Sequence, residues 1–517
     1  TAHAIRAFVL DWNASPVYVG DQTEKYLTDA ELAARRALTL DPTNTLALAD
    51  YAEILTDQQK LDQALINIEQ AVQQDPSLMD VHRVYAYVLE SYRDYRLAIE
   101  EYDKAIAIKA GYAEAYNNRG NALRALKQLD AAVESFNKAI AIKSDHADAY
   151  NNRGIALQEL KQLDAALADY DKALAIKPDY EYLYGTLLHT KMQTCDWQEL
   201  EPSISRLLEQ IARNEKATTA FPVLALTTVL SMQRKAAEIW INDKYPPNHS
   251  LGVIVKRPRS GKIRLGYFSA DFRNHPVSLL AAELFEVHDR TKFEIYAFSF
   301  GQNIMDPMRC RLEKAFDHFI DVRTRSDDEI AKMAREMEID IAIDLGGLTA
   351  DSRTDIFARR AAPIQINYLG YPGTMGAPYI DYIIADRHVI PQESASFYTE
   401  KVAYLPCFQV NDSKRGISER IFTRRELGLP EAGFVFCCFN NSYKITPGIF
   451  DAWMRILKQV EGSVLWLAES NPTATRNLQR EAIGRGVAVE RLVFAQRIPV
   501  PEYLARYRMA DLFLDTL

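Results

Sequence analysis

Cysteine is scarce in this sequence and is not arranged in pairs. The 517 residues include five cysteines, and no two of them have a Cys-x-x-Cys spacing. We therefore expect neither a disulfide framework nor a zinc site built on thiolates, and scattered thiols suit a reducing cytoplasm. On this ground we predict a cytoplasmic protein. The five cysteines are Cys195, Cys310, Cys407, Cys437 and Cys438.

Long apolar runs and an excess of positive charge are also missing. No stretch of about 18 apolar residues occurs, so we expect no membrane-spanning helix. The formal net charge of −9 at pH 7 argues against nucleic acid or an anionic membrane as a partner bound through overall charge. The length of 517 residues exceeds what one hydrophobic core supports, so several domains are expected.

Motifs of several enzyme classes are absent as well. The sequence contains no G-x-G-x-x-G, G-x-x-x-x-G-K-[ST], G-x-S-x-G or H-E-x-x-H. These absences argue against NAD enzymes, P-loop NTPases and serine hydrolases. Because no Asp-x-Asp follows a predicted strand, a metal ion that bridges a diphosphate has no evident ligands. We expect no metal ion and no other cofactor.

The first third of the chain is repetitive. Residues 113–146 and 147–180 are near copies, with Gly120 and Gly154 among the residues that recur 34 positions apart. This period is typical of tetratricopeptide repeats, in which each unit is a pair of antiparallel helices. The small residues let the two helices approach closely, and aromatic residues fill the space between units.

Earlier units are predicted by the same spacing. Residues 79–112 fit the repeat, and residues 45–78 fit it more loosely. We predict an α-solenoid of tetratricopeptide repeats over 1–180. The period is lost after that, although the pattern remains helical, so 181–261 is interpreted as a helical cap and linker.

Such arrays form concave surfaces that bind peptides. Asn118 and Asn152 fall on the first helix of their units, on the face that usually lines this surface. An amide side chain both donates and accepts, so a row of asparagines can hold a peptide backbone of any sequence. We predict that both bind an acceptor peptide. The alternative is a solvated polar helix face, because Val84 and Asp50 occupy the equivalent positions and keep the row short.

From Lys262 onward, short apolar segments alternate with amphipathic helical segments, one of which is predicted at about 447–459. The predicted strands are IRLGYFS, FEIYAFSF, IDIAIDLGG, PIQINYLG and IDYIIAD, followed by FVFCCFN, SVLWLAE, RLVFAQ and DLFLDT. This alternation predicts a mostly parallel sheet covered on both faces. The polar stretch 411–433 interrupts the pattern, which then restarts. We therefore predict two Rossmann-like lobes, 262–415 and 416–517, with a cleft between them.

One polar cluster follows the first predicted strand of each lobe. Arg273, Asn274 and His275 form the first cluster, and 440–444 form the second. Ligands of parallel sheets bind at the carboxyl ends of strands, where helix N-termini present N–H groups to anions. Lys444 would suit a phosphate there. Each cluster alone is equally consistent with ordinary loop chemistry, but the matching positions predict a shared site.

Four segments together resemble a known family. They read RLGYFSADFRNHPVS, APIQINYLGYPGTMGAPYIDYIIAD, CCFNNSYKITPGIFDAWMRILKQVEGSVLWL and ADLFLDT. With the repeats before them, they resemble the tetratricopeptide-fused O-linked N-acetylglucosamine transferases, including the bacterial and plant SPINDLY-like branch. The resemblance implies a GT-B glycosyltransferase that inverts the anomeric carbon without a metal ion. Its donor would be UDP-N-acetylglucosamine, and its acceptor a Ser or Thr hydroxyl of a protein held by the repeats.

The resemblance also assigns roles to residues. His275 matches the active-site histidine of the family, a proposed general base, although it could instead only cap the following helix or position substrate. Lys444 matches the lysine that holds the donor diphosphate and stabilises the leaving nucleotide. The implied nucleotide site contains Asn440, Asn441, Lys444, Tyr503 and Arg506, and the loop at the cleft contains Tyr371, Pro372, Gly373 and Thr374.

Three departures from the family leave alternatives open. Family members continue beyond ADLFLDTL, so we expect the second lobe to be incomplete in this chain. Tyr503 stands where relatives often carry His, and Leu348 stands where several carry a polar residue. Protein O-fucosylation from GDP-fucose therefore remains an alternative, as does a repeat scaffold with a degenerate transferase half. Self-association through repeat edges also stays open.

Overall fold

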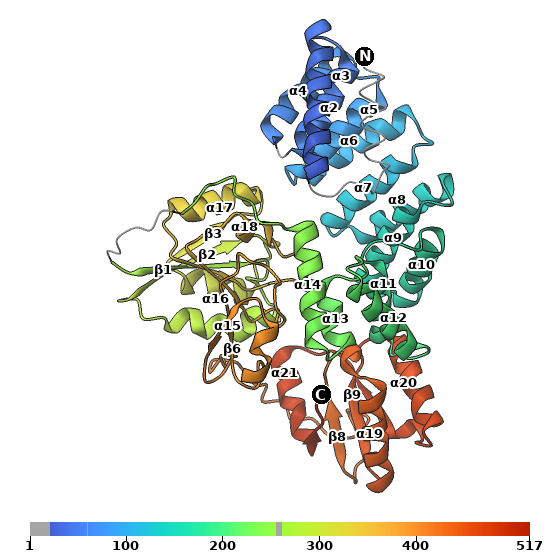
Figure 1. Ribbon diagram of the computed structural model, residues 1–517. Helices are drawn as coiled ribbons and strands as arrows, with labels where there is room; N and C mark the ends of the chain where they lie inside the picture. The colour runs from blue at the N-terminus through green and yellow to red at the C-terminus, as the bar shows by residue number, and fades with distance from the viewer. Residues whose placement is uncertain (1–20, 59, 255–260, 517) are drawn as a thin grey trace. The chain divides into compact units, whose positions relative to one another are not determined.

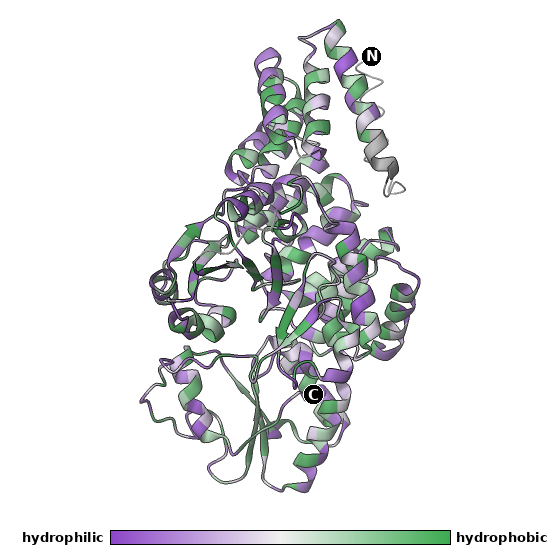
Figure 2. Ribbon diagram, turned by 60° about the vertical axis from the view of Figure 1, so that its left-hand side comes forward, coloured by the Kyte–Doolittle hydropathy of each residue, from purple (hydrophilic) through white to green (hydrophobic). Residues whose placement is uncertain are grey.

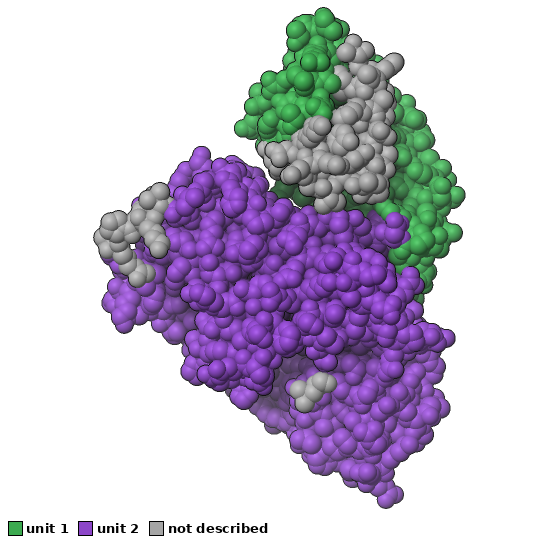
Figure 3. Space-filling model, in the orientation of Figure 1, with its two compact units in different colours: residues 1–178 green, residues 179–517 purple. Residues whose placement is uncertain are grey.

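The computed structural model describes residues 21–58, 60–254 and 261–516 of the chain. The chain forms two compact units, Thr1–Pro178 and Asp179–Leu517, which Figure 3 colours separately. In the described residues the first unit is helical, and the second combines helices with two parallel sheets (Figure 1). The predicted fold class, helical repeats followed by two α/β lobes, is confirmed.

The first unit is a stack of helix pairs joined by short turns. Helices α5, α7 and α9 begin 34 residues apart, as the sequence period predicts. The helices of this unit are α2 (Asp21–Leu40), α3 (Thr45–Asp57), α4 (Leu61–Gln74), α5 (Met79–Ser91), α6 (Tyr95–Ile108), α7 (Ala113–Ala125), α8 (Leu129–Ile142), α9 (Ala147–Glu159) and α10 (Leu163–Ile176).

Glycine sets how closely the two helices of a pair approach. A methyl group added at Gly120 would lie 2.5 Å from the ring of Phe136, and one added at Gly154 would lie 2.5 Å from the ring of Tyr170. Both rings are fully buried. The repeat therefore needs glycine at this position because the aromatic ring of the second helix occupies the space of a Cβ.

Four helices, which we call the helical connector, open the second unit. They share one apolar core, to which Leu188, Leu207, Val223 and Ala236 contribute. The helices are α11 (Leu183–Gln193), α12 (Leu200–Ala212), α13 (Ala220–Leu226) and α14 (Leu230–Lys244).

The first lobe is built on a seven-stranded parallel sheet with the order β3-β2-β1-β4-β5-β6-β7. Its strands are β1 (Ile263–Ser269), β2 (Phe293–Ser299), β3 (His318–Asp321), β4 (Ile341–Asp344), β5 (Ile364–Tyr368), β6 (Tyr382–Ala385) and β7 (Lys401–Tyr404). Its helices are α15 (Pro276–Val287), α16 (Pro307–Ala315), α17 (Asp327–Glu336), α18 (Asp355–Ala358) and the 3-10 helix η1 (Gln392–Phe397).

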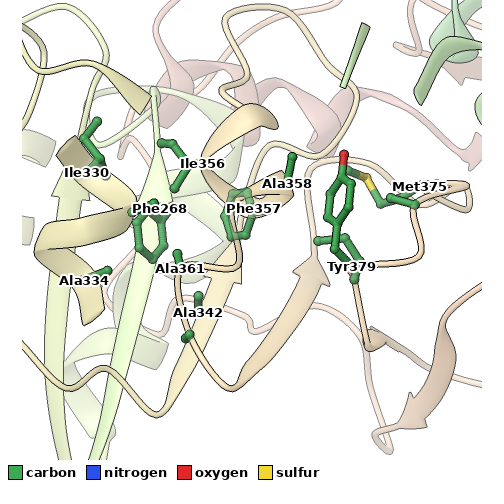
Figure 4. Close-up of a cluster of buried hydrophobic side chains, with 14 of the residues drawn as sticks. Phe268, Ile330, Ala334, Ala342, Ile356, Phe357, Ala358, Ala361, Met375 and Tyr379 are labelled. Atoms are coloured by element: carbon green, nitrogen blue, oxygen red, sulfur yellow. The ribbon is translucent and has the colours of Figure 1, made fainter. Parts of the chain in front are cut away.

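Apolar clusters lie on both faces of this sheet. Figure 2 colours the ribbon by the hydropathy of each residue. One face packs on α15 and α16, through Ala281, Phe285 and Leu312. The other packs on α17, α18 and the connector, and Figure 4 shows Phe268, Ile330 and Phe357 in this cluster. Helices α13 and α14 are part of the same core, because Ala220, Ala237 and Ile241 belong to it.

The second lobe contains a four-stranded parallel sheet with the order β10-β9-β8-β11. Its elements are β8 (Val435–Cys438), η2 (Ser442–Lys444), α19 (Pro447–Gln459), β9 (Val464–Ala468), α20 (Pro472–Gly484), η3 (Val489–Arg491), β10 (Leu492–Ala495), α21 (Val500–Arg506), η4 (Tyr507–Met509) and β11 (Leu512–Phe513). In the described parts of the chain, no helix has both the length and the apolar character needed to span a bilayer.

Candidate active site

A cavity of about 750 Å³ lies where the strand order of the first sheet reverses, between β1 and β4. After β1 its walls include Asp271, Arg273 and His275 to Val277. Leu348 to Ser352 after β4 and Gly370 after β5 also line it. Thr219 to Pro222 and Trp240 of the connector, Tyr245 after it, and Tyr443 of the second lobe also line the cavity. A cavity of this size at a topological switch point is the usual place for a ligand in an open α/β sheet.

His275 lies on the wall of this cavity as the residue that caps α15. Its Nδ1 lies 3.4 Å from the Val277 backbone nitrogen, where a bare Nδ1 would accept the cap hydrogen bond, and Pro276 takes the first helical position. Its side chain is 37% exposed, so it is open to a ligand. Burial lowers the pKa of His275, against the opposing effect of the nearby Asp271 charge, so the imidazole is neutral at pH 7.

Asp271 can select the tautomer of His275. Its Oδ2 lies 3.4 Å from Nδ1, the same atom that Val277 N–H contacts at 3.4 Å. A proton on Nδ1 would be donated to the carboxylate and would leave the Nε2 lone pair available as a base. A deprotonated Nδ1 would instead accept from the Val277 N–H. The proton would then lie on Nε2, and Nε2 could not act as a base.

The backbone around Asp271 is held from both sides. Its N–H donates to Ser269 Oγ at 2.9 Å, and its carbonyl accepts from Ser278 Oγ at 2.5 Å. Burial raises the pKa of Asp271, while the charges of His275 and Arg273 oppose this. Arg273 Nη2 lies 3.5 Å from the carboxylate, and its Nε has no hydrogen-bond partner among the described residues.

The loop after β5 is bent sharply at the cavity. Leu369 has a φ of 76°, which is unusual for a residue with a branched side chain. A Cβ on Gly370 would lie 2.2 Å from the carbonyl oxygen of Leu345, so only glycine fits there. Gly370 lines the cavity, whereas the predicted loop residues Tyr371, Pro372, Gly373 and Thr374 are not among its described lining residues.

Those four residues are instead held in place by the body of the first lobe. Asn367 Nδ2 donates to the carbonyl of Tyr371 at 2.9 Å, and the Tyr398 hydroxyl donates to the carbonyl of Pro372 at 3.0 Å. Thr374 Oγ1 donates to Glu400 Oε2 at 2.8 Å. Because Tyr371 and Thr374 are buried, their side chains support the loop at the cavity.

The second-lobe residues predicted from the 440–444 cluster lie at the other switch point, between β8 and β11. Asn440 Nδ2 donates to Asp515 Oδ1 and to Thr516 Oγ1, both at 2.8 Å, and so joins the ends of these two strands. Asn441 and Lys444 are exposed. Within the described residues, the Lys444 ammonium has no hydrogen bond or ion pair, which leaves it available to an anion.

Tyr503 and Arg506 of α21 pack against Phe439, which follows β8. The Arg506 guanidinium lies 4.4 Å from the ring centre of Phe439 and 4.8 Å from that of Tyr503. It donates to the carbonyl of Gln496 at 2.7 Å and is only 3% exposed. Burial lowers its pKa. Arg506 thus supports an aromatic surface at the strand ends and presents little of its own charge to solvent.

The structure brings only part of the predicted site together. His275 and Tyr443, the neighbour of Lys444, line one cavity. The remaining predicted second-lobe residues are not among the described residues that line it. They lie after β8 and on α21, which packs against Phe439: Asn440, Asn441, Lys444, Tyr503 and Arg506.

Sequence reasoning missed a second histidine beside this cavity. His189 of α11 is buried, and its ring centre lies 5.0 Å from that of Tyr443 and 5.8 Å from that of Phe221, two cavity-lining residues. Burial lowers its pKa to about 4, and its Nε2 has no partner among the described residues. The only sequence signal is a lone histidine in an apolar helix, which is typical of a core residue.

The predicted asparagines of the repeats form a lateral network. Asn152 Nδ2 donates to Asn117 Oδ1 at 3.0 Å, and Asn117 Nδ2 donates to Asn118 Oδ1 at 3.1 Å. Asn151 Nδ2 in turn donates to Asn152 Oδ1 at 3.3 Å. Asn118 lines a cavity of about 530 Å³ within the first unit, while Asn152 is not among the described residues that line it.

No group of three or more His, Cys, Asp or Glu side chains that could hold a metal ion is found over the described ranges of the chain.

Comparison with known proteins places the chain among glycosyltransferases. The family model described as glycosyl transferase family 41 matches residues 238–421 and 416–517, more than half of the chain. Models of the tetratricopeptide repeat match residues 120–161 and 147–180.

Similar curated proteins come from plants and animals. The probable UDP-N-acetylglucosamine–peptide N-acetylglucosaminyltransferase SEC of Arabidopsis thaliana is 35% identical over 352 residues, which cover 64% of this chain and 36% of that protein. The UDP-N-acetylglucosamine–peptide N-acetylglucosaminyltransferase of Caenorhabditis elegans is 26% identical over 450 residues, covering 62% of this chain and 39% of that protein. The chain thus spans little more than a third of these relatives.

One solved structure resembles most of the chain. A variant of the O-GlcNAc transferase of Thermobaculum terrenum aligns with a TM-score of 0.50 at 24% identity, covering 92% of this chain and 78% of that one. At this identity the likeness concerns the fold.

Proposed function

The chain belongs to glycosyl transferase family 41, and on that premise we propose that it transfers N-acetylglucosamine from UDP-N-acetylglucosamine to Ser or Thr hydroxyls of proteins. The observation that carries the proposal is the cavity in which a neutral His275, paired with Asp271, meets the turn next to Lys444. This arrangement combines a base for an acceptor hydroxyl with a cation for a departing diphosphate.

His275 activates the acceptor. The Ser or Thr hydroxyl gives its proton to Nε2 of His275 as its oxygen forms the new bond to the anomeric carbon. Asp271 keeps the Nδ1 proton in place and stabilises the imidazolium that results. Because the acceptor attacks from the side opposite the leaving UDP, the anomeric configuration inverts.

Lys444 stabilises the leaving nucleotide. As the bond from the anomeric carbon to the diphosphate oxygen breaks, negative charge grows on UDP, and the exposed Lys444 ammonium neutralises it without a metal ion. Asn441 offers its amide group to the same nucleotide, and Asn440, whose N–H groups bind Asp515 and Thr516, offers its amide oxygen. Tyr503, backed by Arg506, supplies an aromatic surface for the base.

The repeats hold the protein acceptor. Asn118 and Asn152 bind its backbone, which explains how one groove could serve acceptors of different sequence. Their lateral network with Asn117 and Asn151 supports this proposal, because it orients the amides before a peptide arrives.

The test uses the full-length gene product with host proteins and either UDP-N-acetylglucosamine or GDP-fucose. Mass spectrometry should find N-acetylhexosamine on Ser or Thr, at a rate that EDTA does not change. His275→Ala and Lys444→Ala should each lower the rate by about 10²-fold or more. The control variants His388→Ala and Lys458→Ala remove exposed side chains elsewhere and should retain activity.

Each alternative has its own outcome in this experiment. Fucose in place of N-acetylhexosamine would reassign the donor. No transfer from either donor would support a non-catalytic scaffold. Full activity of Lys444→Ala would contradict the proposed role of Lys444 at the diphosphate.

A further inference from the structure

The turn that carries Lys444 is held by the helical connector. Ser442, at the start of η2, is only 5% exposed, and its Oγ donates to the main-chain carbonyl of Gln193 at 2.7 Å. Asn471, which is 7% exposed, donates its Nδ2 to the same carbonyl at 2.9 Å. Two buried side chains of the second lobe thus converge on one oxygen at the end of α11.

The residues after α11 are embedded in the second lobe. Cys195 is fully buried within that lobe's apolar core, beside Phe436, Cys438 and Phe450. The carbonyl of Thr194 accepts from Asn477 Nδ2 at 2.9 Å. The chain turns through a φ of 50° at Cys195, so the segment is shaped to enter the lobe.

The other end of the connector belongs to the first lobe. Ala237 and Ile241 of α14 lie in the core beneath the first sheet. A Cβ on Gly376 would lie 2.6 Å from the backbone nitrogen of Glu238, so the loop after β5 packs directly on α14. The Tyr379 hydroxyl donates to the carbonyl of Tyr245 at 2.9 Å.

We infer that Ser442 and Asn471 are positioning residues, which fix the Lys444 turn to the connector and thereby to the lobe that carries His275. The inference rests on the proposed function, since it concerns the place of the donor diphosphate. The connector packs into the cores of both lobes, so the hydrogen bonds to Gln193 fix the position of the Lys444 turn relative to the first lobe. Without the hydrogen bonds from Ser442 and Asn471, Lys444 is still present but its position is less well defined. This weakens binding of the donor more than it slows the transfer of bound sugar.

Two variants test this by removing one donor each. Ser442→Ala removes the hydroxyl donor. Asn471→Asp keeps the acceptor that caps α20, where Oδ1 receives the Ala474 N–H at 2.8 Å, but loses the donor to Gln193. In the full-length protein, UDP affinity measured by calorimetry should fall about tenfold in each, as expected for the loss of one buried hydrogen bond.

Steady-state kinetics distinguish a positioning role from a general loss of stability. The donor KM should rise by about the same factor, with kcat changed less than threefold, and Ser442→Thr, which retains a hydroxyl, should restore both. Asn477→Ala removes a bond of the same interface away from the turn, and it should leave UDP affinity within about twofold.

Three results would overturn the inference. Wild-type UDP affinity in Ser442→Ala and Asn471→Asp, with affinity lost in Lys444→Ala, would refute positioning while keeping the proposed donor site. Wild-type affinity in Lys444→Ala would refute both. An equal loss of UDP affinity in Asn477→Ala would show that the contacts between the connector and the second lobe affect donor binding only through general stability.

Discussion

At the scale of single residues, the local surroundings give three histidines two different charge states. His275 and His189 are neutral because burial lowers the pKa of each. His82 of the first unit is the opposite case. Its Nδ1 lies 2.6 Å from Glu101 Oε2 and its Nε2 lies 2.9 Å from the carbonyl oxygen of Pro76, and only an imidazolium can donate to both. The Glu101 bond accordingly raises the pKa of His82.

The charge of His82 predicts a pH-dependent stability of the first unit. A raised folded-state pKa means that the contribution is complete below the unfolded value of about 6.5 and is lost as pH rises through the folded value. Local stability of α5 and α6, measured by amide exchange, should therefore fall toward alkaline pH. In His82→Gln this slope should disappear, although Lys104 still pairs with Glu101. A stability that rises with pH would contradict the assignment.

Asp271 should control the pH dependence of transfer. Its charge raises the pKa of His275 against the larger effect of burial, so Asp271→Asn should lower that pKa. The acid limb of the kcat/KM profile, where His275 must lose its proton, should move to lower pH. Its plateau should fall by about tenfold, because the base is weaker and its tautomer is no longer selected.

A matched variant makes this comparison sharper. Asp351 is another carboxylate that lines the cavity, and it raises the pKa of His275 less than Asp271 does. In Asp351→Asn the acid limb of the kcat/KM profile should therefore move to lower pH by a smaller amount than in Asp271→Asn. A limb that stays in place in Asp271→Asn would mean that another group is the base.

At the scale of elements, the helix pairs of the repeats depend on glycine. In Gly120→Ala the new methyl would overlap the buried ring of Phe136, and the gain in helix propensity of about 1 kcal/mol offsets only part of this. We expect a net local destabilisation of about 1–2 kcal/mol. Amide exchange in α7 and α8 should report it.

Gly111→Ala, in the turn before α7 of the first compact unit, is the matched control. No atom lies within 4 Å of its added Cβ, and its φ is not positive. Exchange in that variant should remain as slow as in the unmodified protein or become slower. Equal protection in Gly120→Ala and Gly111→Ala would show that the ring can move aside.

At the scale of the second unit, the five cysteines act as natural probes of cooperativity. Cys310 and Cys407 are exposed and should react with a maleimide at once. Cys195 is buried with Cys438 in the core of the second lobe, and burial raises its pKa to about 12. Cys437 lies in the adjoining core.

These three buried thiols should become reactive together. The connector segment can be exposed only when the second lobe opens, so Cys195 should follow the rate of Cys437 and Cys438, measured by peptide mass spectrometry after timed labelling. Faster labelling of Cys195 would mean that the connector leaves the lobe by itself.

Local patterns predicted most elements of the second unit but missed the two edge strands of its first sheet. The apolar pattern predicts a helix at about 447–459, where α19 runs from Pro447 to Gln459, because Thr446 caps it and Pro447 suits its first turn. The four-residue strands β3 and β7 escaped prediction. Both lie at the edges of the sheet and are only partly buried, so neither carries a strong apolar run.

The sequence by itself determined the local structure and the chemistry at the strand ends. Helix pairs follow from a 34-residue spacing of small and aromatic residues, and His275 and Lys444 stand after the first strands of their lobes because each turn needs polar residues. Only the tertiary structure decided that His189 meets Tyr443, that Cys195 enters the second lobe, and that Ser442 binds Gln193. Ser442 and Gln193 are 249 positions apart, and such contacts depend on how whole surfaces pack. No local periodicity encodes that packing, because the partners of a buried surface are set by shape and hydrogen bonding over the whole unit.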